Sequence, residues 1–132
     1  MNEKTALQHV ALQYNDRKKA EIFFTKILGL TLKKTFIVSK ELSNNIFGIK
    51  EEVIVDAYSN EKTYIEIFIT KNQRKQGYEH IGLEIKNKEE FIKRCKKYDI
   101  EPIFVKKGER TLLFIKDYAE NLFEIKEKQP KK

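Results

Sequence analysis

The sequence has few residues that could form cross-links or metal clusters: its 132 residues include one cysteine and two histidines. Cys95 alone cannot form an internal disulfide, and one thiolate cannot make the cluster of a structural zinc site. This cysteine falls on the apolar side of a predicted helix, so we interpret it as a small buried residue and not as a nucleophile.

Long apolar segments and nucleic-acid motifs are also absent from the sequence. The first residues, MNEKTALQHVAL, lack the apolar core of a signal peptide, and no run reaches the length of a transmembrane helix. No RNP, zinc-finger or helix-turn-helix signature occurs. We therefore expect a soluble, cytoplasmic protein that binds neither a membrane nor nucleic acid.

The charge of the chain is positive but spread along it. Its 27 Lys and Arg residues and 20 Asp and Glu residues give a net charge of +7, and only the tail has a local surplus of lysines. Interspersed charges are typical of a solvated surface. Because 40% of the residues are apolar, the chain can form an ordinary core. We expect a single domain over residues 1–132, with a basic tail at 128–132.

The first part of the sequence predicts a strand, a helix and three more strands. Residues 7–14, LQHVALQY, alternate as in a half-buried strand. Asp16 can cap the next segment, where apolar residues recur at helical spacing until Gly29 ends it. Residues 39–51 are an irregular or short helical insertion. The three later strands are TLKKTFIV (31–38), EVIVDAY (52–58) and TYIEIFIT (63–70).

The second part repeats this order. HIGLEI (80–85) is a predicted strand, Asn87 can cap the helix after it, and three strands follow at 101–107, 110–116 and 121–127. When the two parts are aligned at an offset of 71 residues, His9 matches His80. An internal repeat indicates one structural unit used twice. The pattern predicts an α+β fold of two tandem βαβββ modules, module 1 at about residues 6–70 and module 2 at about 79–127.

Four polar residues fall on the faces of the two predicted sheets that the helices do not cover. Side chains alternate along a strand, and the apolar side should pack beneath the helix. Singly, such residues are often just hydrogen-bonded or exposed. A symmetric set that includes every histidine favours a divalent cation such as Zn²⁺, Ni²⁺, Co²⁺, Fe²⁺ or Mn²⁺, if the sheets curl toward each other. The set is His9, Glu66, His80 and Glu124.

The sequence resembles the vicinal oxygen chelate superfamily, which contains glyoxalase I, fosfomycin-resistance enzymes, methylmalonyl-CoA epimerase, extradiol dioxygenases and metal-free bleomycin-resistance proteins. The resemblance covers about residues 6–127 and rests on HVALQYNDRKKAEIFFTKILGL, YIEIF, HIGLEI and GERTLLFIKDYAENLFEI. The last stretch is similar to the family's closing hairpin, DPxGNxxEL. Here Tyr118 replaces the proline and Glu120 the glycine, which changes the turn but leaves the ligand strand intact.

The resemblance implies an open, curved mixed β-sheet barrel with helices outside, and one divalent metal ion held by the four residues. A His-Glu-His-Glu order is closest to glyoxalase I (lactoylglutathione lyase), which acts on the hemithioacetal of a 2-oxoaldehyde and a thiol. The metal would stabilise an enediolate by Lewis acidity. Glu124 would take the proton and return it to the neighbouring carbon, and Glu66 could serve the opposite stereochemical face.

The residues that would bind the thiol depart from the glyoxalase I pattern. Bacterial-type enzymes usually have an Arg four residues after the first ligand His and an Asn four residues after the first ligand Glu, where this chain has Gln13 and Thr70. Both differences argue against glutathione itself. The substrate-binding candidates are Gln13, Tyr64, Phe68 and Arg110, and the other cations considered are Lys33, Lys107 and Arg74, although most such cations are ordinary surface residues.

Two other functions of the protein remain open, and each also involves a small-molecule ligand. One is a non-catalytic binding or resistance protein on the same fold, which has no need to keep four metal ligands. The other is thiol transfer to an antibiotic of the fosfomycin type. The resemblance also implies a homodimer, since many members build each site across two chains. Whether His9 and Glu66 meet His80 and Glu124 of the same chain or of a partner is open at this stage.

Overall fold

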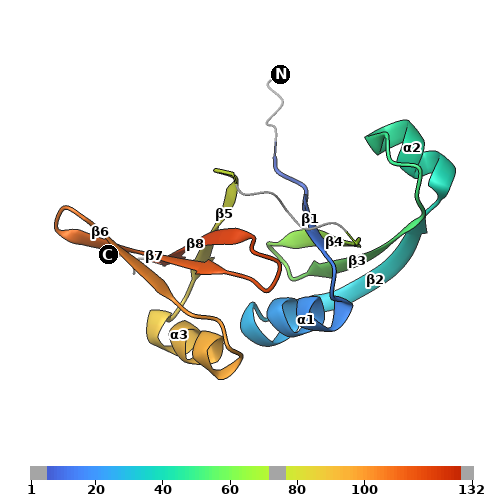
Figure 1. The fold of residues 1–132 in the computed structure, drawn as a ribbon. Coiled ribbons are helices and arrows are strands. Elements are labelled where there is room, and N and C mark those ends of the chain that lie inside the picture. Colours follow the sequence, from blue (N-terminus) through green and yellow to red (C-terminus); the bar gives the residue numbers. More distant parts are fainter. Residues whose placement is uncertain (1–5, 72–76, 129–132) are drawn as a thin grey trace, which may run out of the picture.

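The computed structural model describes residues 6–71 and 77–128, which form eight strands and four helices (Figure 1). Module 1 contains β1 (Val10–Tyr14), α1 (Arg17–Glu21), the π-helix η1 (Ile22–Ile27), β2 (Thr31–Val38), α2 (Lys40–Phe47), β3 (Val53–Ser59) and β4 (Tyr64–Ile69). Module 2 contains β5 (His80–Ile85), α3 (Lys88–Lys97), β6 (Ile103–Lys107), β7 (Arg110–Lys116) and β8 (Leu122–Glu127). The predicted order of elements is present in both modules, and the insertion at 39–51 contains α2.

Each module forms its own four-stranded sheet. The strand order is β1-β4-β3-β2 in module 1 and β5-β8-β7-β6 in module 2. The first strand of each module pairs parallel with the last, and the other neighbours are antiparallel. A parallel pair needs a long crossover connection, which begins with the helix after the first strand. The predicted fold of two βαβββ modules with open, mixed sheets is confirmed.

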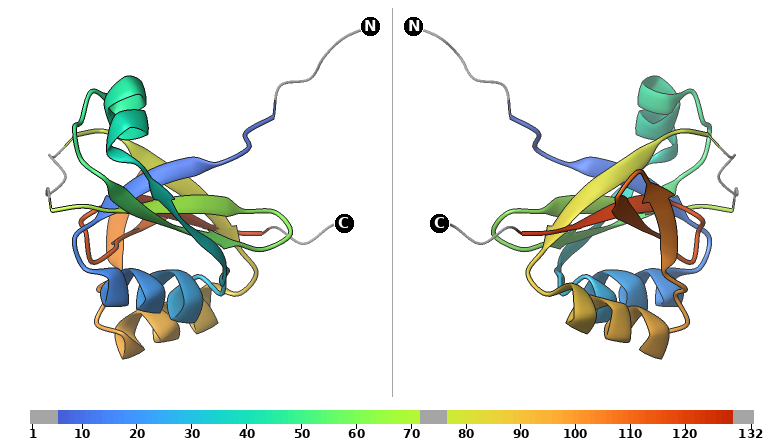
Figure 2. Two further views of the ribbon diagram at one scale, coloured as in Figure 1. Left: turned by 90° about the vertical axis from the view of Figure 1, so that its right-hand side faces the viewer. Right: turned by 90° about the vertical axis from the view of Figure 1, so that its left-hand side faces the viewer.

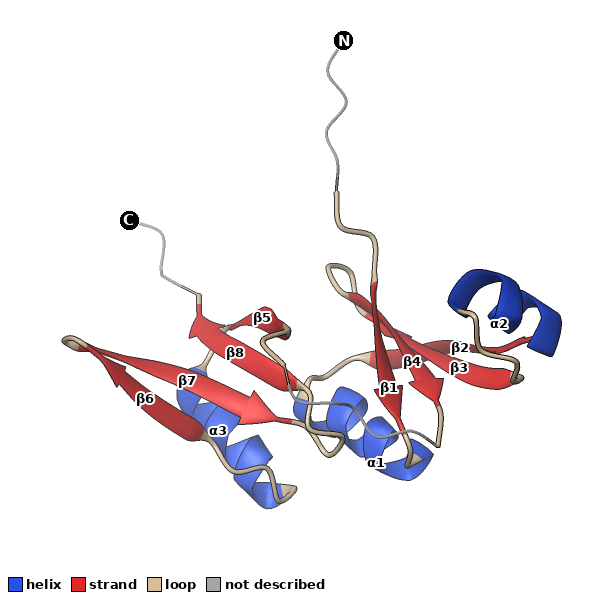
Figure 3. Ribbon diagram, turned by 45° about the horizontal axis from the view of Figure 1, so that its top comes forward, coloured by secondary structure: helices blue, strands red, loops and turns tan. Residues whose placement is uncertain are grey.

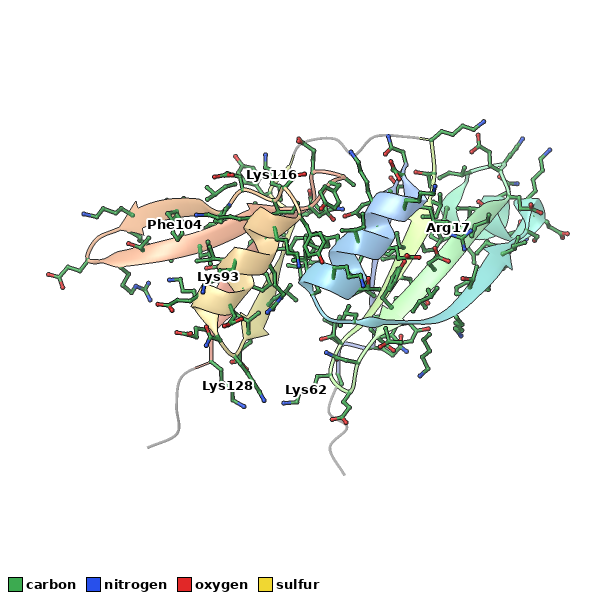
Figure 4. All side chains as sticks on the ribbon, turned by 90° about the horizontal axis from the view of Figure 1, so that it is seen from below. Arg17, Lys62, Lys93, Phe104, Lys116 and Lys128 are labelled. Carbon is green, nitrogen blue, oxygen red and sulfur yellow. The ribbon has the colours of Figure 1, made fainter. Side chains whose placement is uncertain are left out.

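The core lies between the sheets and the helices α1, η1 and α3, which run side by side along one face of both sheets (Figure 2). Residues of both modules contribute to this core. The ring of Phe23 in η1 lies 5.3 Å from that of Phe123 in β8, and Arg94 of α3 donates to the carbonyl oxygen of Ile27 at 3.3 Å. Seen from the helix side, α1 and α3 cover neighbouring parts of the two sheets (Figure 4). Burial of this shared apolar surface holds the modules together.

Both predicted helix caps are present. Asp16 accepts a hydrogen bond from the backbone N–H of Lys19 at 3.1 Å, and Asn87 accepts one from that of Glu90 at 3.0 Å. Each bond satisfies a backbone donor that the first turn of the helix leaves free. Cys95 is buried in the core as predicted, and burial raises the pKa of its thiol to about 11.

Two local predictions were wrong. The strand predicted at 7–14 begins at Val10, so His9 lies just before β1. β1 is an edge strand with β4 as its one neighbour, and their pairing starts at Val10. The helix after Asp16 is α-helical only to Glu21 and then widens into η1, where the N–H of Leu28 bonds to the carbonyl of Phe23. This wider turn accompanies the burial of two consecutive residues, Phe23 and Phe24.

A buried carboxylate beneath α1 was not anticipated from the sequence. Asp56 of β3 is 1% exposed and accepts hydrogen bonds from Arg17 at 2.7 and 2.8 Å and from the Thr35 hydroxyl at 2.6 Å. Burial raises the pKa of Asp56, but these hydrogen bonds outweigh it and the net pKa is lowered. The group therefore stays ionised at neutral pH and ties the start of α1 to the sheet.

Some predictions fall on residues about which the structure gives no placement. Arg74 lies outside the described residues, as do the first five residues and the end of the basic tail, residues 129–132. Among the described residues, no helix is both long enough and apolar enough to cross a membrane.

Candidate metal centre

The first candidate pair, His9 and Glu66, lies on the uncovered face of the module 1 sheet. Glu66 is in β4 beside Ala11 of β1. The Nε2 atom of His9 lies 3.6 Å from Oε1 of Glu66, and its Nδ1 atom contacts the side-chain oxygen of Gln8. Because an amide oxygen only accepts hydrogen bonds, we assign the ring proton to Nδ1. Nε2 is then the ring nitrogen that faces the carboxylate.

The second pair, His80 and Glu124, has the same arrangement in module 2. Glu124 of β8 lies beside Gly82 of β5, and the Nε2 atom of His80 is 3.9 Å from Oε1 of Glu124. The Nδ1 atom of His80 lies 3.1 Å from the backbone oxygen of Tyr78, so it too carries the proton. In both modules, therefore, the Nε2 atom of one histidine faces the carboxylate of one glutamate.

The geometry of each pair fits a divalent cation. Two ligands about 2.1 Å from one ion at a tetrahedral angle are about 3.4 Å apart. The separations of 3.6 and 3.9 Å are slightly longer, which small side-chain rotations would close. Metal-binding histidines usually donate their other N–H to an oxygen, as His9 and His80 do. The donor types and their spacing thus suit a metal ion of the predicted kind.

The structure brings the four residues together as two pairs and not as one set. In the stretches 6–71 and 77–128, no group of three or more His, Cys, Asp or Glu side chains is close enough to hold a metal ion. The two sheets lie side by side (Figure 3). One chain therefore holds the four predicted ligands as two separate pairs.

Comparison with solved structures identifies the fold. The sequence matches no family model and no curated protein. A glyoxalase family protein from Bacillus cereus matches with a TM-score of 0.75 and 18% identity, over 98% of this chain and 97% of that chain. The fosfomycin resistance protein FosX from Listeria monocytogenes matches with a TM-score of 0.72 and 16% identity, over 96% of each chain. The chain has the vicinal oxygen chelate fold.

One further structure with the vicinal oxygen chelate fold contains a metal. A mutant of the same Listeria FosX, complexed with Mn(II) and 1S,2S-dihydroxypropylphosphonic acid, matches with a TM-score of 0.70 and 18% identity, over 94% of this chain and 90% of that chain. Identities this low show a shared fold and not a shared reaction. A divalent cation is nevertheless bound by a protein of this fold, in agreement with the donor set found here.

Three of the four substrate-binding candidates lie near the module 1 pair. The ring of Tyr64 is 6.2 Å from that of His9, while Gln13 and Phe68 are neighbours across β1 and β4. Arg110 begins β7 at the tip of the β6–β7 hairpin, four residues from Phe114, the partner of Glu124. That spacing places Arg110 roughly 13 Å along the strand from Glu124. Lys33 and Lys107 are exposed on β2 and β6.

A cavity lined by residues of both modules reaches one of the four candidate ligands, His80. Its volume is about 620 Å³, and it extends from Gln13 and Phe68 to His80 at the start of β5. One wall comes from α2 and the residues after it, which sequence reasoning assigned no role. Phe47 of α2 makes an edge-to-face contact with Phe68, with ring centroids 5.6 Å apart. The signal that could have revealed this wall is an insertion confined to module 1 that carries apolar residues beside two glutamates.

Proposed function

We propose that the protein is a divalent-metal-dependent lyase or isomerase of the glyoxalase I type, acting on the hemithioacetal of a 2-oxoaldehyde and a thiol. The two matched His–Glu pairs support this proposal. In both, Nε2 lies beside a carboxylate while Nδ1 faces an oxygen. A protein that only sequesters a ligand, without a metal, has no need to hold two histidines in this way.

A homodimer would complete the site. The module 1 pair of one chain and the module 2 pair of another would hold one ion, which could be Ni, Zn, Co, Fe or Mn. A two-fold axis would generate two such sites. Apolar side chains that a second copy could cover are exposed on α2 and on β6, whose Phe104 lies on the outer hairpin in Figure 4. They are Leu42, Ile46, Ile103, Phe104 and Val105.

The proposed reaction moves one proton between neighbouring carbons. A bound cation supplies Lewis acidity, which lowers the barrier to removing a proton beside a carbonyl. Glu124 is the proposed base that takes this proton and returns it to the next carbon. Its side chain is 21% exposed on the uncovered face, so it is accessible to a substrate. Glu66 occupies the equivalent position at 17% exposure and would serve the opposite face of the substrate.

Fosfomycin-type thiol transfer is a second candidate, favoured by the similarity of fold to FosX. It requires a site for a phosphonate dianion. The described residues that line the cavity include Lys71 but also Glu51, Glu52 and Glu79. An excess of carboxylates disfavours a dianion, so we rank this candidate below the lyase.

Metal analysis and a substrate panel test the proposal. Purified protein should contain about one divalent ion per chain, as expected for two shared sites in a dimer. It should convert methylglyoxal–thiol adducts and leave fosfomycin unchanged in the presence of thiols. Metal-free protein with no turnover would favour the non-catalytic binding protein. Conversion of fosfomycin in the presence of a thiol, without conversion of the methylglyoxal–thiol adducts, would favour thiol transfer.

A variant of the base tests the mechanism separately. Glu124→Gln should abolish turnover while the metal content stays unchanged, because an amide can still lie beside the ion but cannot accept the proton. Glu101→Gln, at an exposed position outside both pairs, is the matched control and should keep full activity. An unaffected rate in Glu124→Gln would reject the assignment.

A further inference from the structure

The cavity beside α2 has the size of a small-molecule site. Its volume of about 620 Å³ lies within the range of roughly 300–1,000 Å³ that is usual for such pockets. On the side of module 1 it begins at Phe68, which lies two residues after Glu66 on the same face of β4, about 7 Å along the strand. At its other end it reaches His80. Of the four predicted ligands, His80 lines the cavity, so a molecule held at His80 can extend into it.

The walls of the cavity are mainly apolar. The α2 insertion contributes Phe47 and Ile49, and Phe47 contacts Phe68 of β4 edge to face. Leu122 and Ile81 lie on the side of module 2. Gln13 and Thr70 also line it and are uncharged. Aromatic and branched walls of this kind bind apolar groups by removing them from water.

The described residues that line the cavity carry more acidic than basic groups. Its described lining contains three carboxylates, Glu51, Glu52 and Glu79, and one ammonium group, that of Lys71. The sign of this described lining is opposite to the net charge of +7 of the whole chain. An anionic group placed here would lose hydration against apolar walls and would face like charges.

We propose that this cavity binds an apolar, non-anionic tail of the substrate, such as an aromatic or branched aliphatic group that ends in a hydroxyl or an amine. The inference deepens the proposed function, and its meaning for catalysis rests on that function. The substrate class would be the adduct of an apolar thiol or an apolar 2-oxoaldehyde, and not one that carries the carboxylates of glutathione at this end.

Three probes that share a phenylethyl group but differ in charge test the inference by binding alone, without turnover. The probes are 2-phenylethylamine, 2-phenylethanol and 3-phenylpropionate, titrated into metal-free full-length protein while backbone amide signals are followed by NMR. We expect the amine and the alcohol to bind with a Kd on the order of 1 mM and to shift Gln13, Phe47 and Phe68. The carboxylate should bind at least about tenfold more weakly.

Variants locate the site. Phe47→Ala should weaken the alcohol at least about fivefold because it removes one aromatic wall. Ile46→Ala is the matched control on α2, since Ile46 is 59% exposed and does not line the cavity; it should leave the Kd unchanged. Glu51→Gln/Glu52→Gln should improve binding of the carboxylate about threefold and leave the alcohol unaffected.

Three results would overturn the inference: the carboxylate binds as tightly as the amine, no probe binds, or Phe47→Ala changes the mass of the assembly in sedimentation while all probe affinities stay the same. The last would make α2 a contact between copies of the chain. Because the probes are titrated without metal, failure of the metal or turnover experiments leaves this test unaffected, and the two proposals can fail separately.

Discussion

The two modules fill equivalent positions beneath their helices in different ways. In module 1, Asp56 of β3 pairs with Ile67, the residue after Glu66, and binds Arg17 and Thr35. In module 2, the position that pairs with Ile125, the residue after Glu124, is Leu113. Both side chains are almost fully buried. The fold thus accepts a hydrogen-bonded carboxylate or an aliphatic group at this point, provided that the space is filled and every buried charge has partners.

The modules differ again at the cavity. Module 1 has α2 and the cavity wall that follows it, and module 2 has no counterpart among its described residues. The His–Glu pairs, in contrast, have nearly the same geometry in both modules. Divergence at the periphery beside two matched pairs is the arrangement expected if the pairs carry the chemistry and the periphery selects the substrate.

Removing one pair at a time should give the largest effect. His9→Ala/Glu66→Ala and His80→Ala/Glu124→Ala should each lower kcat/KM at least about a thousandfold, because the metal contributes several kcal/mol to the barrier. Mixing the two variants under subunit exchange should restore about a quarter of wild-type activity, since half of the dimers then contain one intact site. No recovery in the mixture would contradict a site shared between chains.

Equivalent helix positions should differ strongly in stability. Phe23 is fully buried against Phe123, while the equivalent residue of module 2 is Arg94, an exposed side chain that bonds to Ile27. Phe23→Ala should lower the free energy of unfolding by about 3–4 kcal/mol because it opens a cavity in the shared core. Arg94→Ala should cost about 0.5–1 kcal/mol. Urea denaturation measures both, and similar losses would refute an unequal contribution of the two helices.

The carboxylate of module 1 should make stability depend on pH. Asp56→Asn should lower the free energy of unfolding by about 2 kcal/mol at pH 7, less than for a fully buried pair because the Arg17 side chain is 47% exposed. The pKa of Asp56 is raised by burial but lowered overall by its hydrogen bonds. Its stabilisation is therefore present above the unfolded pKa of about 3.9 and lost as the pH falls through the lower folded value.

A buried carboxyl group of module 2 should change stability with pH in the opposite direction. Asp117 of module 2 is buried at the closing turn, and burial raises its pKa. Its contribution has the opposite sign: it is complete below the unfolded pKa and is lost as the pH rises through the folded pKa. The difference between wild type and Asp56→Asn should shrink below about pH 4. A difference that stays constant from pH 7 to pH 3 would show that the ion pair does not stabilise module 1.

The helix caps should show the smallest effect and the closest agreement between modules. Asp16→Ala and Asn87→Ala each remove one bond to a backbone N–H, and the two bonds have lengths of 3.1 and 3.0 Å. Each variant should lose about 1 kcal/mol, with a few tenths more at Asp16 because its charge also interacts with the helix dipole. Thermal unfolding measures this, and a loss at one cap only would mean that the helices are not equivalent.

Much of the fold could be predicted because it follows from short-range patterns. β2, β5 and β7 have the predicted bounds, and both caps are in place. The errors fall where tertiary contacts decide. Whether His9 joins β1 depends on its neighbour β4, and the widening of the helix into η1 accompanies the burial of Phe23 and Phe24 together. Local periodicity carries no information on either point.

The sequence by itself determined the repeat, the alternation along each strand and the equivalence of His9 with His80 and of Glu66 with Glu124. These are properties of residue order. Only the tertiary structure decided that the four residues form two separate pairs, and that the insertion builds a cavity wall. The physical reason is that both outcomes depend on how the two sheets and α2 pack in space, which contacts between sequence-distant residues determine and local patterns do not.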